Sequence, residues 1–189
     1  MARSKGSSSG TLPVALEMLE ADHRKVEMLF DQYEEMKEGA GEDEKRELSQ
    51  RICMELKVHT QIEEEIFYPW ARENMEEEDL IEEAQVEHQS AKDLIAQLEG
   101  AGEIDETYDA KVKVLGEYVK HHVQEEENEM FPQVESMQEE LDELGQEMTA
   151  RKVELMEEMG MTQDDEAQQA IAGERSRSGA RGGQAQRGA

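Results

Sequence analysis

Two segments of the chain repeat a histidine that is followed by a glutamate four residues later. His59 and Glu63 form the first pair, and His122 and Glu126 form the second. The segments coincide when one is shifted by 63 residues, and the shift also aligns apolar residues three and seven positions before each histidine. Residues with these spacings share one face of a helix. Each pair can therefore reach a common centre from the apolar side of its helix.

Two more histidines, His23 and His88, are related by a shift of 65 residues, and each lies in the middle of an apolar helical stripe. A single histidine on such a face is usually a core residue satisfied by a hydrogen bond, but here four histidines and two glutamates share the apolar faces. A buried carboxylate is costly unless it is paired or bound to metal, so the set predicts metal ligation. The predicted ligands are His23, His59, Glu63, His88, His122 and Glu126.

The number of predicted ligands indicates how many ions they hold. Six ligands exceed the four of a tetrahedral zinc site. Two ions, each with two histidines and bridged by the two carboxylates, use the whole set and leave positions open for water or a small external ligand. Imidazole and carboxylate ligands with open positions suit iron best, with manganese and zinc as alternatives. We therefore expect two iron ions as the cofactor.

Long helical patterns position these residues, and no alternating β-branched run competes with them. Glycines and prolines interrupt the patterns and set their expected limits. We expect Thr11 to cap the first helix with Pro13 in its first turn, and we expect the second helix to end before Pro69. The expected helices cover about residues 11–37, 43–68, 76–99, 106–131 and 132–159, with Gly160 as the C-cap of the last one.

The two repeats make the chain two copies of a helical hairpin. The predicted fold class is all-α, with a four-helix bundle over residues 11–132 and a trailing C-terminal helix over residues 133–160. The first ten residues and the last part of the chain are rich in Gly, Ser, Arg and Gln, with almost nothing apolar to bury. We therefore expect disordered tails at residues 1–10 and 161–189.

The duplicated motif also carries a family resemblance. In both copies His-x-x-x-Glu-Glu is followed by an aromatic residue and proline, as Phe67-Tyr68-Pro69 and as Phe131-Pro132. In this the chain resembles the hemerythrin-like, His-His-Glu cation-binding family, over about residues 12–155. The resemblance implies an up-down four-helix bundle with a non-haem di-iron centre, held by the same six residues.

Two positions depart from the oxygen-carrying hemerythrins. Those proteins have a further histidine one turn after the third-helix histidine, where this chain has Lys92, and they have an aspartate five residues after the last histidine, whereas Glu126 follows by four. The resemblance therefore implies the hemerythrin-like branch and argues against reversible oxygen carriage. We expect a protein that binds or reacts with dioxygen, nitric oxide or peroxide. An iron-responsive regulatory or iron-handling protein is the alternative, because a ligand set does not specify a turnover.

Composition limits the expected partners and compartment. Acidic residues outnumber basic ones 48 to 20, and the net charge of −28 opposes binding to nucleic acid or to anionic membranes. No stretch is apolar for the length that a membrane helix requires, and the first ten residues lack the apolar core of a signal peptide. The single cysteine, Cys53, cannot form an intrachain disulfide. We therefore expect a cytoplasmic protein whose partner is a small diatomic or peroxide ligand.

Some residues near the predicted ligands have two interpretations. His121 and Glu125 form a competing pair four residues apart, but this register does not match the first copy, so we expect His121 to flank the site. Glu64 and Glu127 occur in both copies and either orient the ligand imidazoles or face solvent. Packing is favoured over hydrogen bonding at the centre for the three tyrosines Tyr33, Tyr68 and Tyr118.

Overall fold

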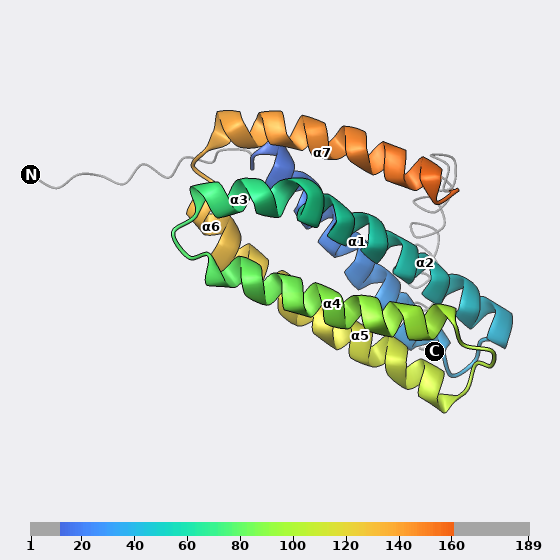
Figure 1. The fold of residues 1–189 in the computed structure, drawn as a ribbon. Coiled ribbons are helices and arrows are strands. Elements are labelled where there is room, and N and C mark those ends of the chain that lie inside the picture. Colours follow the sequence, from blue (N-terminus) through green and yellow to red (C-terminus); the bar gives the residue numbers. More distant parts are fainter. Residues whose placement is uncertain (1–11, 161–189) are drawn as a thin grey trace, which may run out of the picture. The chain divides into compact units, whose positions relative to one another are not determined.

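The regular structure of the described chain is helical. The computed structural model describes residues 12–160, and no strand is present among them. The long helices of the bundle (Figure 1) are α1 (Val14–Met36), α2 (Glu42–Ile62), α4 (Asp79–Glu99) and α5 (Glu106–Glu125). The other elements are η1 (Glu63–Phe67), α3 (Tyr68–Asn74), η2 (Glu126–Met130), α6 (Phe131–Val134) and α7 (Gln138–Glu158). The predicted all-α fold class is confirmed.

The bundle follows the order of the chain. Helix α1 packs against α2 and α5, and α4 packs against the same two helices. The order around the bundle is therefore α1, α2, α4, α5, with consecutive helices joined as antiparallel neighbours (Figure 1). This is the up-down arrangement that two helical hairpins produce.

The four helices pack around an apolar core. Along the bundle axis, this core lies on one side of the predicted ligands. Its members include Tyr33, Ile52, Leu98 and Leu115, each at most 2 % exposed. Full burial of one large apolar side chain stabilises a fold by about 1.5–3 kcal/mol. The packed core therefore fixes the four helices relative to one another, and the helices hold the polar residues of the centre in place.

Both proline-containing segments depart from the predicted helix ends. The prediction that the second helix ends before Pro69 is wrong, because the chain remains helical through η1 and α3 to Asn74. The fourth helical segment likewise continues past Phe131 through α6. Each π segment is closed by a bond across five residues, from the Tyr68 N–H to the Glu63 carbonyl and from the Phe131 N–H to the Glu126 carbonyl. Each proline then falls in the first turn of a new α-helical piece, where its missing N–H costs nothing.

Other predicted limits differ by a few residues. Helix α1 has Pro13 as its N-cap, so this proline precedes the first turn, and the predicted cap Thr11 lies outside the described residues. Helix α4 begins at Asp79, and α7 begins at Gln138 because a turn separates it from α6. Gly160 has the left-handed φ of 75° expected at the end of the last helix. The predicted tails also lie outside the described residues.

The first part of α7, through Lys152, belongs to the same compact unit as the bundle. Gly145 lets this part approach α1 closely, since a Cβ atom at that position would lie 2.6 Å from the Ala15 nitrogen. The Val14 N–H donates to Asp142 at 2.9 Å. No helix in residues 12–160 combines the length and the apolar character needed to cross a membrane.

Candidate metal centre

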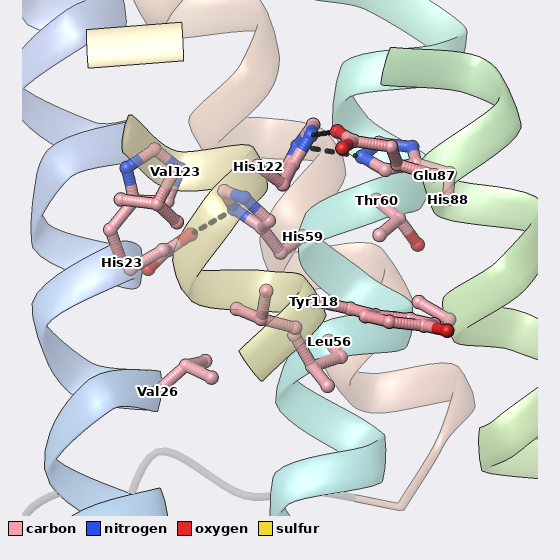
Figure 2. Close-up of a pocket in the computed structure, with 13 residues that line it drawn as sticks. His23, Val26, Leu56, His59, Thr60, Glu87, His88, Tyr118, His122 and Val123 are labelled. Carbon is pink, nitrogen blue, oxygen red and sulfur yellow. Dashed lines mark hydrogen bonds and ion pairs between the residues drawn. The ribbon is translucent and has the colours of Figure 1, made fainter. Parts of the chain in front are cut away.

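The structure brings all six predicted ligand residues together inside the bundle. The histidines come from the four long helices, one from each, and the glutamates are the first residues of η1 and η2. All six are between 0 and 6 % exposed. Figure 2 shows the histidines around a pocket between the helices. The residues are His23 on α1, His59 on α2, Glu63 on η1, His88 on α4, His122 on α5 and Glu126 on η2.

These side chains form two overlapping groups with the spacing of metal ligands. One contains His23, His59, Glu63 and Glu126, and the other contains Glu63, His88 and His122. Within each group the possible ligand atoms lie within 4.8 Å of one another. Glu63 belongs to both groups, as a carboxylate that bridges two ions would.

The two carboxylates face imidazoles from both groups. One Glu63 oxygen lies 3.2 Å from His59 Nε2, and the other lies 3.4 Å from His88 Nε2. Glu126 Oε2 lies 3.3 Å from His23 Nε2 and 3.7 Å from His122 Nε2. The Nε2 atoms of all four histidines therefore point at the glutamates in the middle of the bundle.

The π segments contribute directly to this arrangement. Glu63 and Glu126 begin η1 and η2, at the point where each helix widens by one residue per turn. Single π turns inside α-helices are frequent at functional sites. The sequence analysis missed both of them, although the proline six residues after each glutamate was the available signal.

Carboxylates on the outer side of the imidazoles fix their orientation. Glu127 accepts from His23 Nδ1 at 2.8 Å, and Glu64 accepts from His88 Nδ1 at 3.0 Å. Of the two interpretations left open for this repeated pair, the structure supports the orienting role. Such partners set the tautomer and the ring orientation of metal-binding histidines.

Two further carboxylates of this kind were missed by the sequence analysis. Glu87 accepts from His122 Nδ1 at 2.9 Å, a contact drawn as a dashed line in Figure 2. Asp22 Oδ2 lies 3.7 Å from His59 Nδ1, which is an ion-pair distance and too long for a hydrogen bond. Asp22 and Glu87 coincide under the shift of 65 residues and directly precede His23 and His88, so the repeat contained a signal for them.

The buried polar atoms at the centre lack partners that a cation would supply. A neutral imidazole that donates from Nδ1 presents an unprotonated Nε2, and the Nε2 atoms of His88 and His122 face each other at 3.1 Å. In the described chain no hydrogen bond reaches His23 Nε2, His59 Nε2 or either oxygen of Glu63. A buried polar group without a partner costs about 1–3 kcal/mol. The donor set therefore fits metal ions.

Without a metal, the centre holds protons in unusual places. Burial opposes protonation of His23, but the carboxylate of Glu126 at 3.3 Å and the hydrogen-bonded carboxylate of Glu127 raise its pKa from 6.5 to about 10. Burial and the charge of Glu126 raise the pKa of Glu63 above its ordinary value. The imidazoles around Glu126 lower its pKa although burial opposes this. Metal binding must displace the protons that remain.

Tyr68 differs from the packing role expected of it. Its hydroxyl donates to Glu126 at 2.8 Å and lies 3.2 Å from His88 Nε2 and 3.5 Å from His122 Nε2. The corresponding position in the second copy is Phe131, whose ring stacks on His23 with 7° between the planes. The repeat therefore predicts two equivalent halves, whereas the structure places a phenol in only one of them. The hydroxyl of Tyr33 binds Asp109 instead.

Lys92 occupies the position where the oxygen carriers have an additional histidine. Its ammonium donates to both oxygens of Glu64 at 2.5 and 2.6 Å, and Glu64 in turn orients His88. Lys92 thus stabilises a partner of a ligand residue. His121, which we expected to flank the site, has a side chain that is 61 % exposed and lies outside both buried groups.

Comparisons with known proteins agree with this architecture. The family model described as the hemerythrin HHE cation-binding domain matches residues 14–134. A solved protein from Mycobacterium kansasii that contains a hemerythrin HHE cation-binding domain is similar in fold, with a TM-score of 0.62. It is 24 % identical, and the match covers 77 % of this chain and 88 % of that one. A protein of Nostoc sp. named DNA nickase is 25 % identical over 146 residues, which are 76 % of this chain. The chain spans 40 % of the length of that relative.

Proposed function

Because the chain belongs to the hemerythrin HHE cation-binding domain family, we propose that its centre holds two iron ions and that the iron-loaded protein binds or reacts with dioxygen, nitric oxide or peroxide. The observation that carries this proposal is the pair of buried His and Glu groups that share Glu63. Two groups with one common carboxylate fit a dinuclear site better than one ion or two independent ions.

The ligand atoms suggest how the ions would be shared. His23 and His59 would hold one ion, and His88 and His122 would hold the other. Glu63 and Glu126 would contact both, because each lies between imidazoles of both groups. Iron bound there would supply redox chemistry and open positions for a small ligand.

The surroundings of the centre favour a small and uncharged ligand. A cavity of about 20 Å³ beside the histidines is lined by Asp22 and Glu87 and by apolar side chains that include Val26, Leu56 and Val123 (Figure 2). A space of this size holds about one water-sized molecule. The Tyr68 hydroxyl lies next to His88 and His122 and can donate a hydrogen bond within that half of the centre. Charged or larger substrates would have to disrupt the apolar lining.

One contact favours iron-dependent regulation or iron handling as the second candidate function. Lys152 on α7 forms a salt bridge with Asp22, and Asp22 faces His59. A ligand residue is therefore connected through one carboxylate to the helix that follows the bundle. Metal occupancy at His59 would then influence how firmly the first part of α7 is held.

The activity named for the Nostoc relative is not proposed for this chain. The match covers 40 % of that protein, so its activity can depend on parts that have no counterpart here. The net charge of −28 also opposes association with a phosphate backbone.

Anaerobic reconstitution with ferrous iron tests the proposal. Optical spectra would be recorded before and after exposure to air, nitric oxide and peroxide, together with the iron content per chain. We expect about two ions per chain and spectral changes with at least one of these ligands. Uptake of two ions without any response would favour iron handling over reactivity with these ligands, and absence of iron uptake would reject both candidate functions.

A further inference from the structure

We propose that Glu87, His121 and Glu125 form a second, solvent-facing site for a divalent cation, through which ferrous iron enters the buried centre. The three side chains come from α4 and α5 and offer ligand atoms within 4.8 Å of one another. His121 Nε2 lies 3.7 Å from Glu87 Oε1 and 3.3 Å from Glu125 Oε1. One imidazole and two carboxylates are suitable ligands for ferrous and manganous ions.

Exposure distinguishes this outer site from the buried centre. The side chain of His121 is 61 % exposed, and those of Glu87 and Glu125 are 21 % and 29 % exposed. A hydrated cation can therefore reach all three without any opening of the bundle. A net charge of −28 also raises the local concentration of cations at the surface.

A small cavity lies between the two outer carboxylates and the buried centre. It has a volume of about 10 Å³ and is lined by Glu87 and Glu125 as well as by His122 and Glu126. Glu126 is 1 % exposed, and its Oε2 makes no hydrogen bond in the described chain. The residue that carries this unpartnered oxygen therefore lines the same cavity as the outer carboxylates.

Glu87 belongs to both sites. Its Oε2 accepts from His122 Nδ1 at 2.9 Å, while its Oε1 faces His121. A cation at the outer site would thus be one carboxylate away from an imidazole of the inner centre. Neighbouring residues of α5 then have different tasks: His122 faces inward and His121 faces the approaching ion.

The alternative interpretation is a set of surface contacts between His121 and the two glutamates that holds no metal. Metal uptake separates the two, because an ion pair does not bind a divalent cation. Manganous ion alone is a suitable probe, since the free ion has a strong paramagnetic resonance signal that weakens on binding. Titrations at about 0.15 M salt would suppress weak association with the acidic surface.

The first experiment counts manganous ions bound to the full chain after the inner centre has been loaded with iron. We expect one additional ion per chain, and we expect His121→Ala and Glu125→Gln each to weaken its binding by about tenfold or more. Glu117→Gln is the matched control, because Glu117 is an exposed glutamate on the same helix that pairs with Lys113 instead. Binding that survives His121→Ala, or that falls equally in the control, would overturn the outer site.

The second experiment tests entry, which rests on the inner iron centre proposed above. At limiting ferrous iron, His121→Ala should load the inner centre several-fold more slowly and reach the same final iron content. An unchanged loading rate would overturn the entry role. A His59→Ala chain disrupts the inner centre but leaves the outer ligands intact, and it should still bind the manganous ion. Failure of the inner centre and failure of the outer site are therefore distinguishable.

Discussion

His122 and His121 show how much depends on one position in a helix. Adjacent residues differ by about 100° around the axis, so only one of them can face the centre. The structure places His122 at the buried group and leaves His121 exposed, although each has a glutamate four residues later. The alignment of the two copies predicted this choice from the sequence, because only His122 matches His59.

His122→Ala should lower both the metal content and the melting temperature. The change removes a ligand and leaves Glu126 with one imidazole fewer in a buried site. His121→Ala should keep the inner metal content after a chelator wash and should shift stability by no more than about 0.5 kcal/mol. Metal analysis and thermal unfolding of the two variants provide the comparison. The opposite pattern would mean that the repeat alignment is wrong by one residue.

Tyr68→Phe should destabilise the metal-free protein. The substitution keeps the ring and removes the hydroxyl that donates to Glu126 at 2.8 Å. Loss of one partner from a buried charged acceptor costs about 1–3 kcal/mol. Chemical unfolding of the metal-free protein measures the effect. Tyr118→Phe serves as the control, because Tyr118 is 48 % exposed and should tolerate the loss. Equal effects of the two substitutions would contradict the role of Tyr68.

At the scale of the elements, the sequence predicted which helices carry the buried histidines and glutamates but not how those helices continue. The shifts of 63 and 65 residues were sufficient to place the ligands on apolar faces. The rule that proline ends a helix failed at Pro69, because the π turn that begins at Glu63 ends just before a new α-helical piece. Pro69 then lies in the first turn of that piece. The orienting role of Glu87 depends on α5 being the neighbour of α4, and such contacts between helices are set by the bundle and not by local spacing.

Lys152→Ala should weaken metal binding although Lys152 contacts no ligand residue. Burial alone would raise the pKa of Asp22, but His59 and Lys152 lower it from 3.8 to about 2, so Asp22 remains charged beside His59. Without the lysine, Asp22 loses the donor that fixes its carboxylate, and it orients His59 less firmly. Loss of a group that orients a ligand imidazole directly costs about 10–100-fold in metal affinity, so the loss from Lys152→Ala, one contact further away, should be smaller than this.

Arg151→Ala is the matched control for the lysine substitution. Arg151 is the preceding residue on α7, and it contacts Glu65 at 2.8 Å. Glu65 belongs to neither buried group of possible ligand atoms. Competition with a chelator should show a change for Lys152→Ala and almost none for Arg151→Ala. If both variants lose affinity equally, α7 acts through packing and not through Asp22.

At the scale of the whole molecule, the carboxylates form a ring that follows the order of the helices. Asp22 on α1 faces His59 on α2, and Glu87 on α4 faces His122 on α5. The π segments complete the ring, because Glu64 accepts a hydrogen bond from His88 and Glu127 accepts one from His23. Each long helix or its π extension thus supplies a carboxylate to the histidine of the next helix. Orientation of the ligands is therefore a property of the complete bundle.

Loading with iron should raise the melting temperature, because only the folded chain presents all six ligands together. At a free metal concentration 100 times the dissociation constant, one site adds about 2.7 kcal/mol to the free energy of unfolding. Thermal unfolding with and without iron, together with metal analysis, measures both quantities. One ion per chain, or none after careful anaerobic reconstitution, would contradict the dinuclear centre.

The stability of the metal-free protein should fall as the pH rises from about 6.5 to about 10. Burial opposes protonation of His23, but Glu126 and Glu127 raise its pKa from 6.5 to about 10. In this window the folded chain holds a proton that the unfolded chain has lost. The stabilisation from His23 is therefore complete below pH 6.5 and disappears toward pH 10.

Metal affinity should change in the opposite direction over the same window. An ion can bind His23 only after the proton has left, so a rising pH favours the ion. Chemical unfolding of the metal-free protein and competition with a chelator, each at a series of pH values, measure the two trends. His23→Gln should weaken both trends, because glutamine does not titrate, and what remains reports groups such as Glu63, whose pKa is also raised. A metal-free stability that rises across the window would show that His23 is neutral in the folded chain, and that the carboxylates around it do not carry the charge assigned to them here.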